Sequence, residues 1–204
     1  MLGLLLLGGC RSAYYSAWEQ FGVHKRDLLK KNVVKARDEQ AAAQEQFKDA
    51  LTRLKEITRF DGGKLEKQYE ALKNDFEECS SRAAAVRSRI KEVETVAGDL
   101  FAEWEKEIEQ IGTASLRESS RQQLAATRER YDDLHRALKS AEKSMDPVIR
   151  QFSDYVLYLK HNLNAQAIAS LKGEAASIQN EIARLIEQMN QSIARADEFV
   201  KAMK

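Results

Sequence analysis

Apolar residues recur along most of this chain at alternating steps of three and four residues, which is the spacing of a coiled-coil seam. The longest run keeps this alternation for more than five heptads, whereas an isolated amphipathic helix would drift at a period of 3.6 residues. It predicts one helix over residues 64–110, about 70 Å long at 1.5 Å per residue. Its seam consists of Leu65, Tyr69, Leu72, Phe76, Cys79, Ala83, Val86, Ile90, Val93, Ala97, Leu100 and Trp104.

A second seam lies before this helix and a third lies after it. The earlier one predicts a first helix that ends at Phe60-Asp61-Gly62-Gly63, because each glycine costs about 1 kcal/mol inside a helix. Its members are Val33, Ala36, Gln40, Ala43, Phe47, Ala50, Leu54 and Ile57. On the other side, Ile111-Gly112-Thr113-Ala114 predicts a second turn, after which Ser115 and Glu118 have the spacing of a capping box that starts a third helix.

The third helix meets the only proline of the chain, Pro147. Proline directly after Asp146 suits the first position of a new helix. The apolar phase nevertheless continues unchanged from Met145 to Leu159, and a loop would not preserve it, so we favour one helix kinked at the proline. A last heptad run covers residues 168–199, and no linker separates it from the rest.

The sequence thus predicts an all-α protein, an elongated antiparallel coiled-coil bundle of three long helices with the third kinked or broken near Pro147. The pattern leaves open whether the seams close within one chain or between copies in a homo-oligomer. Charge agrees with solvated helix surfaces, because 33 basic residues are interspersed with 32 acidic ones and the net charge is +1. Phosphate binding needs a concentrated basic face, so we expect no nucleic-acid partner.

The first ten residues are apolar in a chain that is otherwise polar. Leu7-Gly8-Gly9-Cys10 resembles a bacterial lipobox, in which the cysteine is acylated and becomes the first residue of the mature protein. We therefore expect a lipoprotein signal segment over residues 1–9, lipidation at Cys10 and a single helical domain over residues 10–204. Signal peptides usually run about 15 to 30 residues with a basic start, so we expect the true start to lie upstream. The alternative is a short apolar tail with an incidental cysteine.

Few residues suggest chemistry. Asp132 and His135 have the spacing of the carboxylate–histidine pairs in di-iron bundles, but the further carboxylates that such a site needs are not apparent. Cys79 lies on an apolar seam, where a thiol packs as a small hydrophobe. We expect no enzyme activity, no catalytic residue, no cofactor and no metal. The most unusual stretch, residues 154–171, suggests a partner-binding or register-setting layer, with outward-facing polar residues as the alternative; the layer would comprise Tyr155, Tyr158, His161, Asn162 and Asn164.

Four segments carry a family resemblance: YYSAWEQFGVHKRDLL near the start, RFDGGKLE and SLRESS at the two turns, and VLYLKHNLNAQAIASLKGE near the end. They resemble a family of bacterial lipoproteins built on a domain of unknown function, and the resemblance spans nearly all of residues 10–201. It implies a helical protein of the Gram-negative cell envelope and carries over no activity, cofactor or catalytic residue.

Together these patterns predict a lipid-anchored periplasmic coiled-coil protein that acts as a non-enzymatic spacer, scaffold or adaptor in the bacterial envelope. Its partners would be the membrane, through acylated Cys10, and a protein of the envelope. Arg11 and Ser12 after the cysteine resemble the pattern of lipoproteins sorted to the outer membrane, so we favour the periplasmic face of that membrane over the inner membrane. The alternative is a soluble cytoplasmic coiled-coil module that binds within a larger assembly.

Overall fold

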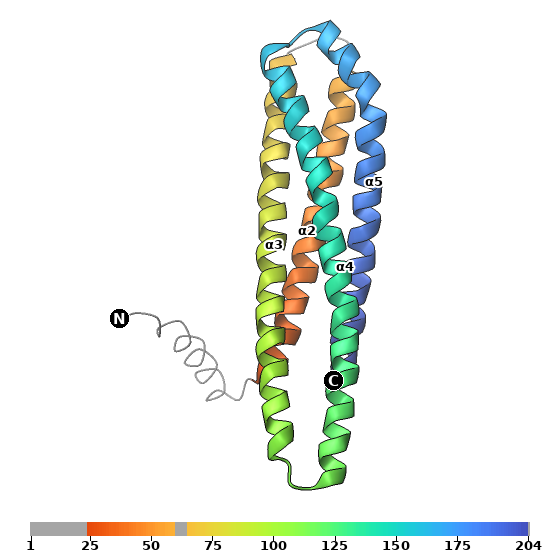
Figure 1. The fold of residues 1–204 in the computed structure, drawn as a ribbon. Helices are drawn as coiled ribbons and strands as arrows, with labels where there is room; N and C mark the ends of the chain where they lie inside the picture. The colour runs from red at the N-terminus through yellow and green to blue at the C-terminus, as the bar shows by residue number, and fades with distance from the viewer. Residues whose placement is uncertain (1–23, 60–64, 204) are drawn as a thin grey trace, which may run out of the picture.

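The computed structural model describes residues 24–59 and 65–203, which form four long α-helices. They are α2 (Lys25–Thr58), α3 (Leu65–Gln110), α4 (Ala114–His161) and α5 (Ala165–Ala202) (Figure 1). Helices α3 and α4 contain 46 and 48 residues, which corresponds to about 70 Å each. The protein is therefore all-α and elongated, as the sequence predicts.

The helices run alternately up and down and surround one core (Figure 1). Each helix packs against two neighbours, in the order α2, α3, α4, α5 and back to α2. This closed arrangement is the up-down-up-down topology of a four-helix bundle. The seams of the four helices thus pack against one another within one chain.

The predicted seams form the core of the bundle. Of the seam members named above, all but Phe76 and Trp104 are buried, and these two are partly exposed while packing against the core. Complete burial of one large apolar side chain contributes about 1.5–3 kcal/mol, so the stripe on each helix is the main source of stability. The largest fully buried side chains are Phe47, Phe152, Leu29, Leu54, Ile57, Leu72, Ile90, Leu134, Leu138, Met145, Leu159 and Ile178.

The prediction of three helices is wrong, because the chain turns between Asn162 and Asn164. Asn162 ends α4: its backbone N–H donates to Leu159 O and its side-chain Nδ2 donates to Tyr158 O, at 3.1 and 2.9 Å. Asn164 begins α5: its side-chain oxygen accepts from the backbone N–H of Ala167 at 2.9 Å. Asparagine side chains that bond nearby backbone groups favour helix ends over helix interiors. This explains a break without glycine or proline.

Helix α4 continues through Pro147, so the preference for one helix over a new helix at this point is confirmed. A proline inside a helix costs roughly 3 kcal/mol or more, because it removes one backbone hydrogen bond and crowds the preceding turn. Met145 and Val148 on either side of it are fully buried in the same apolar stripe. Their burial keeps the helix continuous.

The sequence predicts two turns at glycines, and the structure tests one of them. The interruption between α3 and α4 is confirmed, but α4 begins at Ala114 with Thr113 as its N-cap residue, and no side-chain capping bond is formed there. The predicted capping box at Ser115 and Glu118 is therefore wrong. The expected turn between α2 and α3 lies at residues 60–64, outside the described residues.

One layer of the core is polar. Gln40 of α2 and Ser192 of α5 are both completely buried, and their side-chain polar atoms make no hydrogen bond. One turn away along α2, Gln44 is also buried but donates to Asn190 Oδ1 at 2.8 Å and to Ile186 O at 3.3 Å. A buried polar group without a partner costs about 1–3 kcal/mol. The layer at Gln40 therefore reduces the stability of the bundle.

We expect Gln40→Leu to raise the free energy of unfolding by roughly 1–3 kcal/mol, because leucine fills similar space without an unsatisfied amide. Urea unfolding followed by circular dichroism measures the change. Gln44→Leu is the matched control and should give no comparable gain, since it removes two formed hydrogen bonds. Equal gains from both substitutions would contradict this account.

We also expect Asn164→Ala to lower the free energy of unfolding by about 0.5–2 kcal/mol, because it removes the capping bond to Ala167. Thr113→Ala, at the N-cap of α4, is the control, because Thr113 makes no such bond and its loss should have little effect. Thermal unfolding of both variants tests the difference. A control as destabilised as Asn164→Ala would show that the capping bond is not the cause.

Candidate functional site

The bundle is not equally thick at its two ends. Helices α3 and α4 and their connecting turn project beyond the first residue of α2 and the last residues of α5 (Figure 1). Lys25, at the start of α2, forms an ion pair with Glu103, which is still seven residues before the last residue of α3, Gln110. The α3–α4 hairpin, residues 104–123, is therefore a two-helix projection on a four-helix body.

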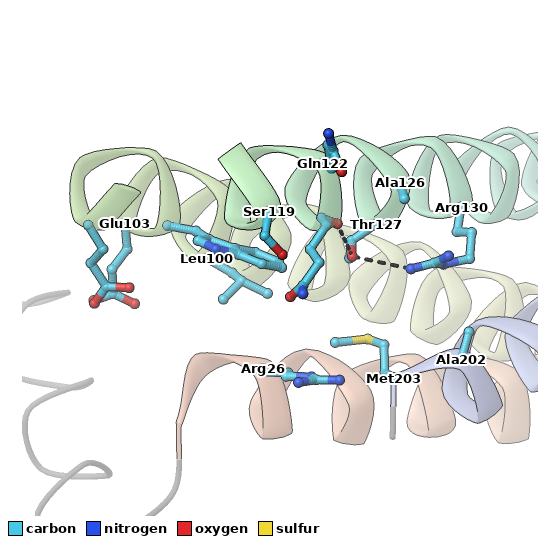
Figure 2. A pocket seen from close by; sticks show the side chains of 13 residues that line it. Arg26, Leu100, Glu103, Ser119, Gln122, Ala126, Thr127, Arg130, Ala202 and Met203 are labelled. Atoms are coloured by element: carbon cyan, nitrogen blue, oxygen red, sulfur yellow. Dashed lines mark hydrogen bonds between the residues drawn. The ribbon is translucent and has the colours of Figure 1, made fainter. Parts of the chain in front are cut away.

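A cleft of about 570 Å³ lies where the hairpin leaves the body. Figure 2 shows it between the α3–α4 pair on one side and the ends of α2 and α5 on the other. Its apolar lining is Leu100, Trp104, Ala126, Ala202 and Met203, and its polar lining is Arg26, Glu103, Glu107, Ser119, Gln122, Gln123, Thr127 and Arg130. Sequence reasoning did not find this cleft, because it arises from the unequal lengths of helices and not from a motif.

Polar contacts hold the hairpin in shape. The indole Nε1–H of Trp104 donates to Ser120 Oγ at 2.9 Å and so links α3 to α4 beside the cleft. At the turn, Arg117 Nε donates to Ile111 O at 2.9 Å and satisfies a carbonyl at the end of α3. The hairpin thus presents a fixed surface.

Large apolar side chains that are exposed lie near the two ends of the bundle. Among the described residues they are Leu116, Leu157 and Tyr158, whose exposed fractions are 61%, 59% and 39%. Leu116 follows the α3–α4 turn at one end, whereas Leu157 and Tyr158 precede the α4–α5 turn at the other. The other apolar side chains of this size in residues 24–59 and 65–203 are at least partly buried. Any contact driven by apolar burial therefore favours the ends over the sides.

The residues predicted as a layer lie together at the α4–α5 turn, but they do not form one layer. Tyr155 is buried, and its hydroxyl donates to Glu174 O of α5 at 3.3 Å. Burial raises the pKa of this hydroxyl above its ordinary value. Tyr158 and His161 point outward, and the two asparagines cap the helices. We call this end of the bundle, residues 155–164, the α4–α5 corner: Tyr155 is buried in it, and Tyr158 and His161 are exposed on its surface.

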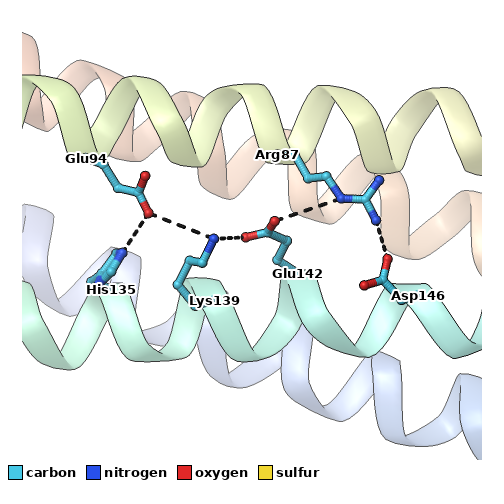
Figure 3. A network of polar contacts seen from close by, with 6 residues as sticks. All are labelled: Arg87, Glu94, His135, Lys139, Glu142 and Asp146. Carbon is cyan, nitrogen blue, oxygen red and sulfur yellow. Dashed lines mark hydrogen bonds and ion pairs between the residues drawn. The ribbon is translucent and has the colours of Figure 1, made fainter.

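His135 belongs to a chain of ion pairs between α3 and α4 (Figure 3). Its Nε2 lies 2.8 Å from Glu94 Oε1, and its ring stacks on Tyr131 with centroids 5.8 Å apart. The run continues through Lys139, Glu142, Arg87 and Asp146. The hydrogen bond to Glu142 raises the pKa of Lys139. In the part of the chain that the structure describes, no cluster of three or more His, Cys, Asp or Glu side chains is placed to hold a metal.

Cys79 is fully buried on α3, and its thiol donates to Gln46 O of α2 at 3.6 Å. Burial raises the pKa of this thiol to about 12, with further contributions from Asp75, Glu78 and Asp49. Because the thiolate is the nucleophile, Cys79 stays unreactive in the folded protein at neutral pH. The other cysteine, Cys10, lies outside the described residues, as does the proposed signal segment.

Comparisons with known proteins identify the family but no activity. Within the described residues, no helix combines the length and the apolar composition that crossing a membrane requires. No curated protein and no solved structure matches the chain. A family model described as "Protein of unknown function (DUF2959)" matches residues 14–203. Since this match covers nearly the whole sequence, the chain belongs to the DUF2959 family of proteins of unknown function.

Proposed function

We propose that this protein is a lipid-anchored, non-enzymatic spacer or adaptor of the bacterial cell envelope. Acylated Cys10 would hold it at the periplasmic face of the outer membrane, and the bundle would present the α4–α5 corner to a protein partner. Two or three acyl chains suffice for stable anchoring, because each buried methylene contributes about 0.8 kcal/mol. The residues before Cys10 support this anchor by their resemblance to a lipobox.

The observation that carries the proposal is that the two ends of the bundle differ: the chain enters at one end and exposes apolar side chains at the other. Helix α2 begins beside the projecting hairpin, so a chain leading from Cys10 reaches the bundle at that end (Figure 1). Leu157 and Tyr158 lie at the opposite end. With helices of about 70 Å between the two ends, an anchor at one and an exposed apolar pair at the other suit a protein that acts across a distance.

The corner has a composition that suits a protein contact. Tyr158 and Leu157 supply adjacent exposed apolar surface, and Lys160 and His161 supply polar groups beside it. Exposed aromatic side chains rimmed by polar residues are characteristic of interaction surfaces. Tyr155 and the asparagine caps fix the backbone under this surface, so a partner would meet an ordered corner.

The first test is the mass of the mature chain. Protein purified from membranes of its native bacterium should begin at Cys10, lack residues 1–9 and carry the added mass of acyl chains in its N-terminal peptide. Cys10→Ala should leave the chain unmodified and outside the membrane fraction. An unmodified wild-type chain that retains Met1 would exclude the anchor and favour a cytoplasmic binding module.

The second test concerns orientation. Leu116 and Leu157 are exposed to nearly the same extent, 61% and 59%, so cysteines at these positions can carry matched fluorescent labels. Cys79 does not compete for the label, since it is fully buried and its pKa is about 12. In vesicles that hold the acylated protein, nitroxide-labelled lipid should quench the probe at residue 116 and leave the probe at residue 157 bright. Equal quenching would mean that the bundle lies flat, which contradicts a spacer.

A further inference from the structure

The cleft beside the hairpin marks the point where a four-helix bundle loses two of its helices. Along the four-helix body, α2 packs against α3 and α5 packs against α4. Past Glu103, seven more residues of α3 extend to Gln110 without that cover, which is about 10 Å at 1.5 Å per residue. Trp104 and the buried Ile108 continue the apolar stripe of α3 into this projection, whereas Ser119, Gln122 and Gln123 make the α4 side of the cleft polar.

The side chains at the cleft agree with an incomplete core. Trp104 continues the seam of α3, four residues after the buried Leu100, yet it is only partly buried. Met203, just past α5, closes the cleft from the opposite side and is buried. Tryptophan buries about 150–250 Å² when it is fully enclosed, so covering Trp104 would add substantial stability.

The chain itself supplies a segment of suitable length and composition. Residues 14–23, with the sequence YYSAWEQFGV, directly precede His24 and so lead to the start of α2 beside the cleft. They include Tyr14, Trp18 and Phe21, which share one face at helical spacing, and a single charged residue, Glu19. As a helix, ten residues would span about 15 Å, enough for the 10 Å projection.

The extent of the family supports the same assignment. The DUF2959 model begins at residue 14, ten residues before His24, so the segment belongs to the family domain and not to a leader. From these observations we infer that residues 14–23 occupy the cleft, with the aromatic face of Tyr14, Trp18 and Phe21 against Trp104 and Met203. The segment completes the bundle around the base of the α3–α4 hairpin.

This placement shortens the tether to the membrane. With residues 14–23 in the cleft, only Arg11, Ser12 and Ala13 separate Cys10 from the bundle. Three residues span at most about 11 Å when fully extended, so an acylated Cys10 would hold the hairpin end close to the lipid surface. This consequence rests on the proposed anchor, whereas occupation of the cleft does not.

The two tryptophans of the chain, Trp18 and Trp104, make the proposal measurable. The full-length chain with Cys10→Ser, which has no lipid, is used throughout, so that the result is independent of anchoring. Trp18→Phe leaves Trp104 as the only tryptophan and keeps an aromatic ring in the segment. Changing Tyr14, Trp18 and Phe21 together to serine should raise acrylamide quenching of Trp104 about twofold, because its ring loses the cover of the aromatic face.

The matched control changes polar residues of the same segment, Glu19→Ser and Gln20→Ser, in the Trp18→Phe background, and should leave Trp104 protected. Circular dichroism checks that the bundle stays helical in each variant. A second measurement needs no destabilising change: in Trp104→Phe, the remaining Trp18 should be shielded from acrylamide and become accessible in urea.

Three results would overturn the inference. Equal quenching of Trp104 in the serine variant and its parent would show that the segment does not occupy the cleft. Quenching of Trp18 to the level of a free tryptophan derivative would show the same. Protection of Trp104 that disappears on dilution, in step with dissociation of a dimer measured by sedimentation, would assign the cleft to a second copy of the chain.

Discussion

Burial of one continuous apolar stripe on each helix is the constraint on which the whole structure depends. No single helix of this length can hide its stripe, and four helices in a closed ring hide all of them at once. The same constraint keeps α4 helical through Pro147, since Met145 and Val148 are buried on both sides of it. The bundle also accommodates the unsatisfied side chain of Gln40 in its core. The free-energy cost of one buried amide is small compared with the total stabilisation from apolar burial.

The sequence predicted the seams well because heptad spacing reports burial directly. It failed at the α4–α5 turn for a physical reason: Asn162 and Asn164 break the helix through bonds to their own backbone, and the apolar residues on either side conceal the interruption. The sequence did not predict the cleft at Trp104 either, since the cleft depends on where α2 and α5 end relative to α3. Where neighbouring helices end relative to one another depends on the tertiary structure, and the heptad spacing of one helix does not predict it.

The sides and the ends of the bundle have different characters. Along the α3–α4 side, the ion pairs from Arg87 to His135 satisfy charges within the molecule. Such exposed pairs contribute little to stability and offer few unpaired groups to a partner. Apolar exposure is instead concentrated at Leu116, Leu157 and Tyr158 near the turns. Among the described residues, exposed large apolar side chains therefore lie at the two ends of the bundle and not along its sides.

An even number of antiparallel helices returns the chain to the end where it started. The first residues of α2 and the last residues of α5 accordingly lie at the same end, and Met203 lines the cleft there together with Arg26. Affinity tags or fluorescent proteins fused after Lys204 would emerge beside that cleft and crowd it. The α4–α5 turn, at the far end, is the place where an inserted reporter would leave the cleft and the start of α2 undisturbed.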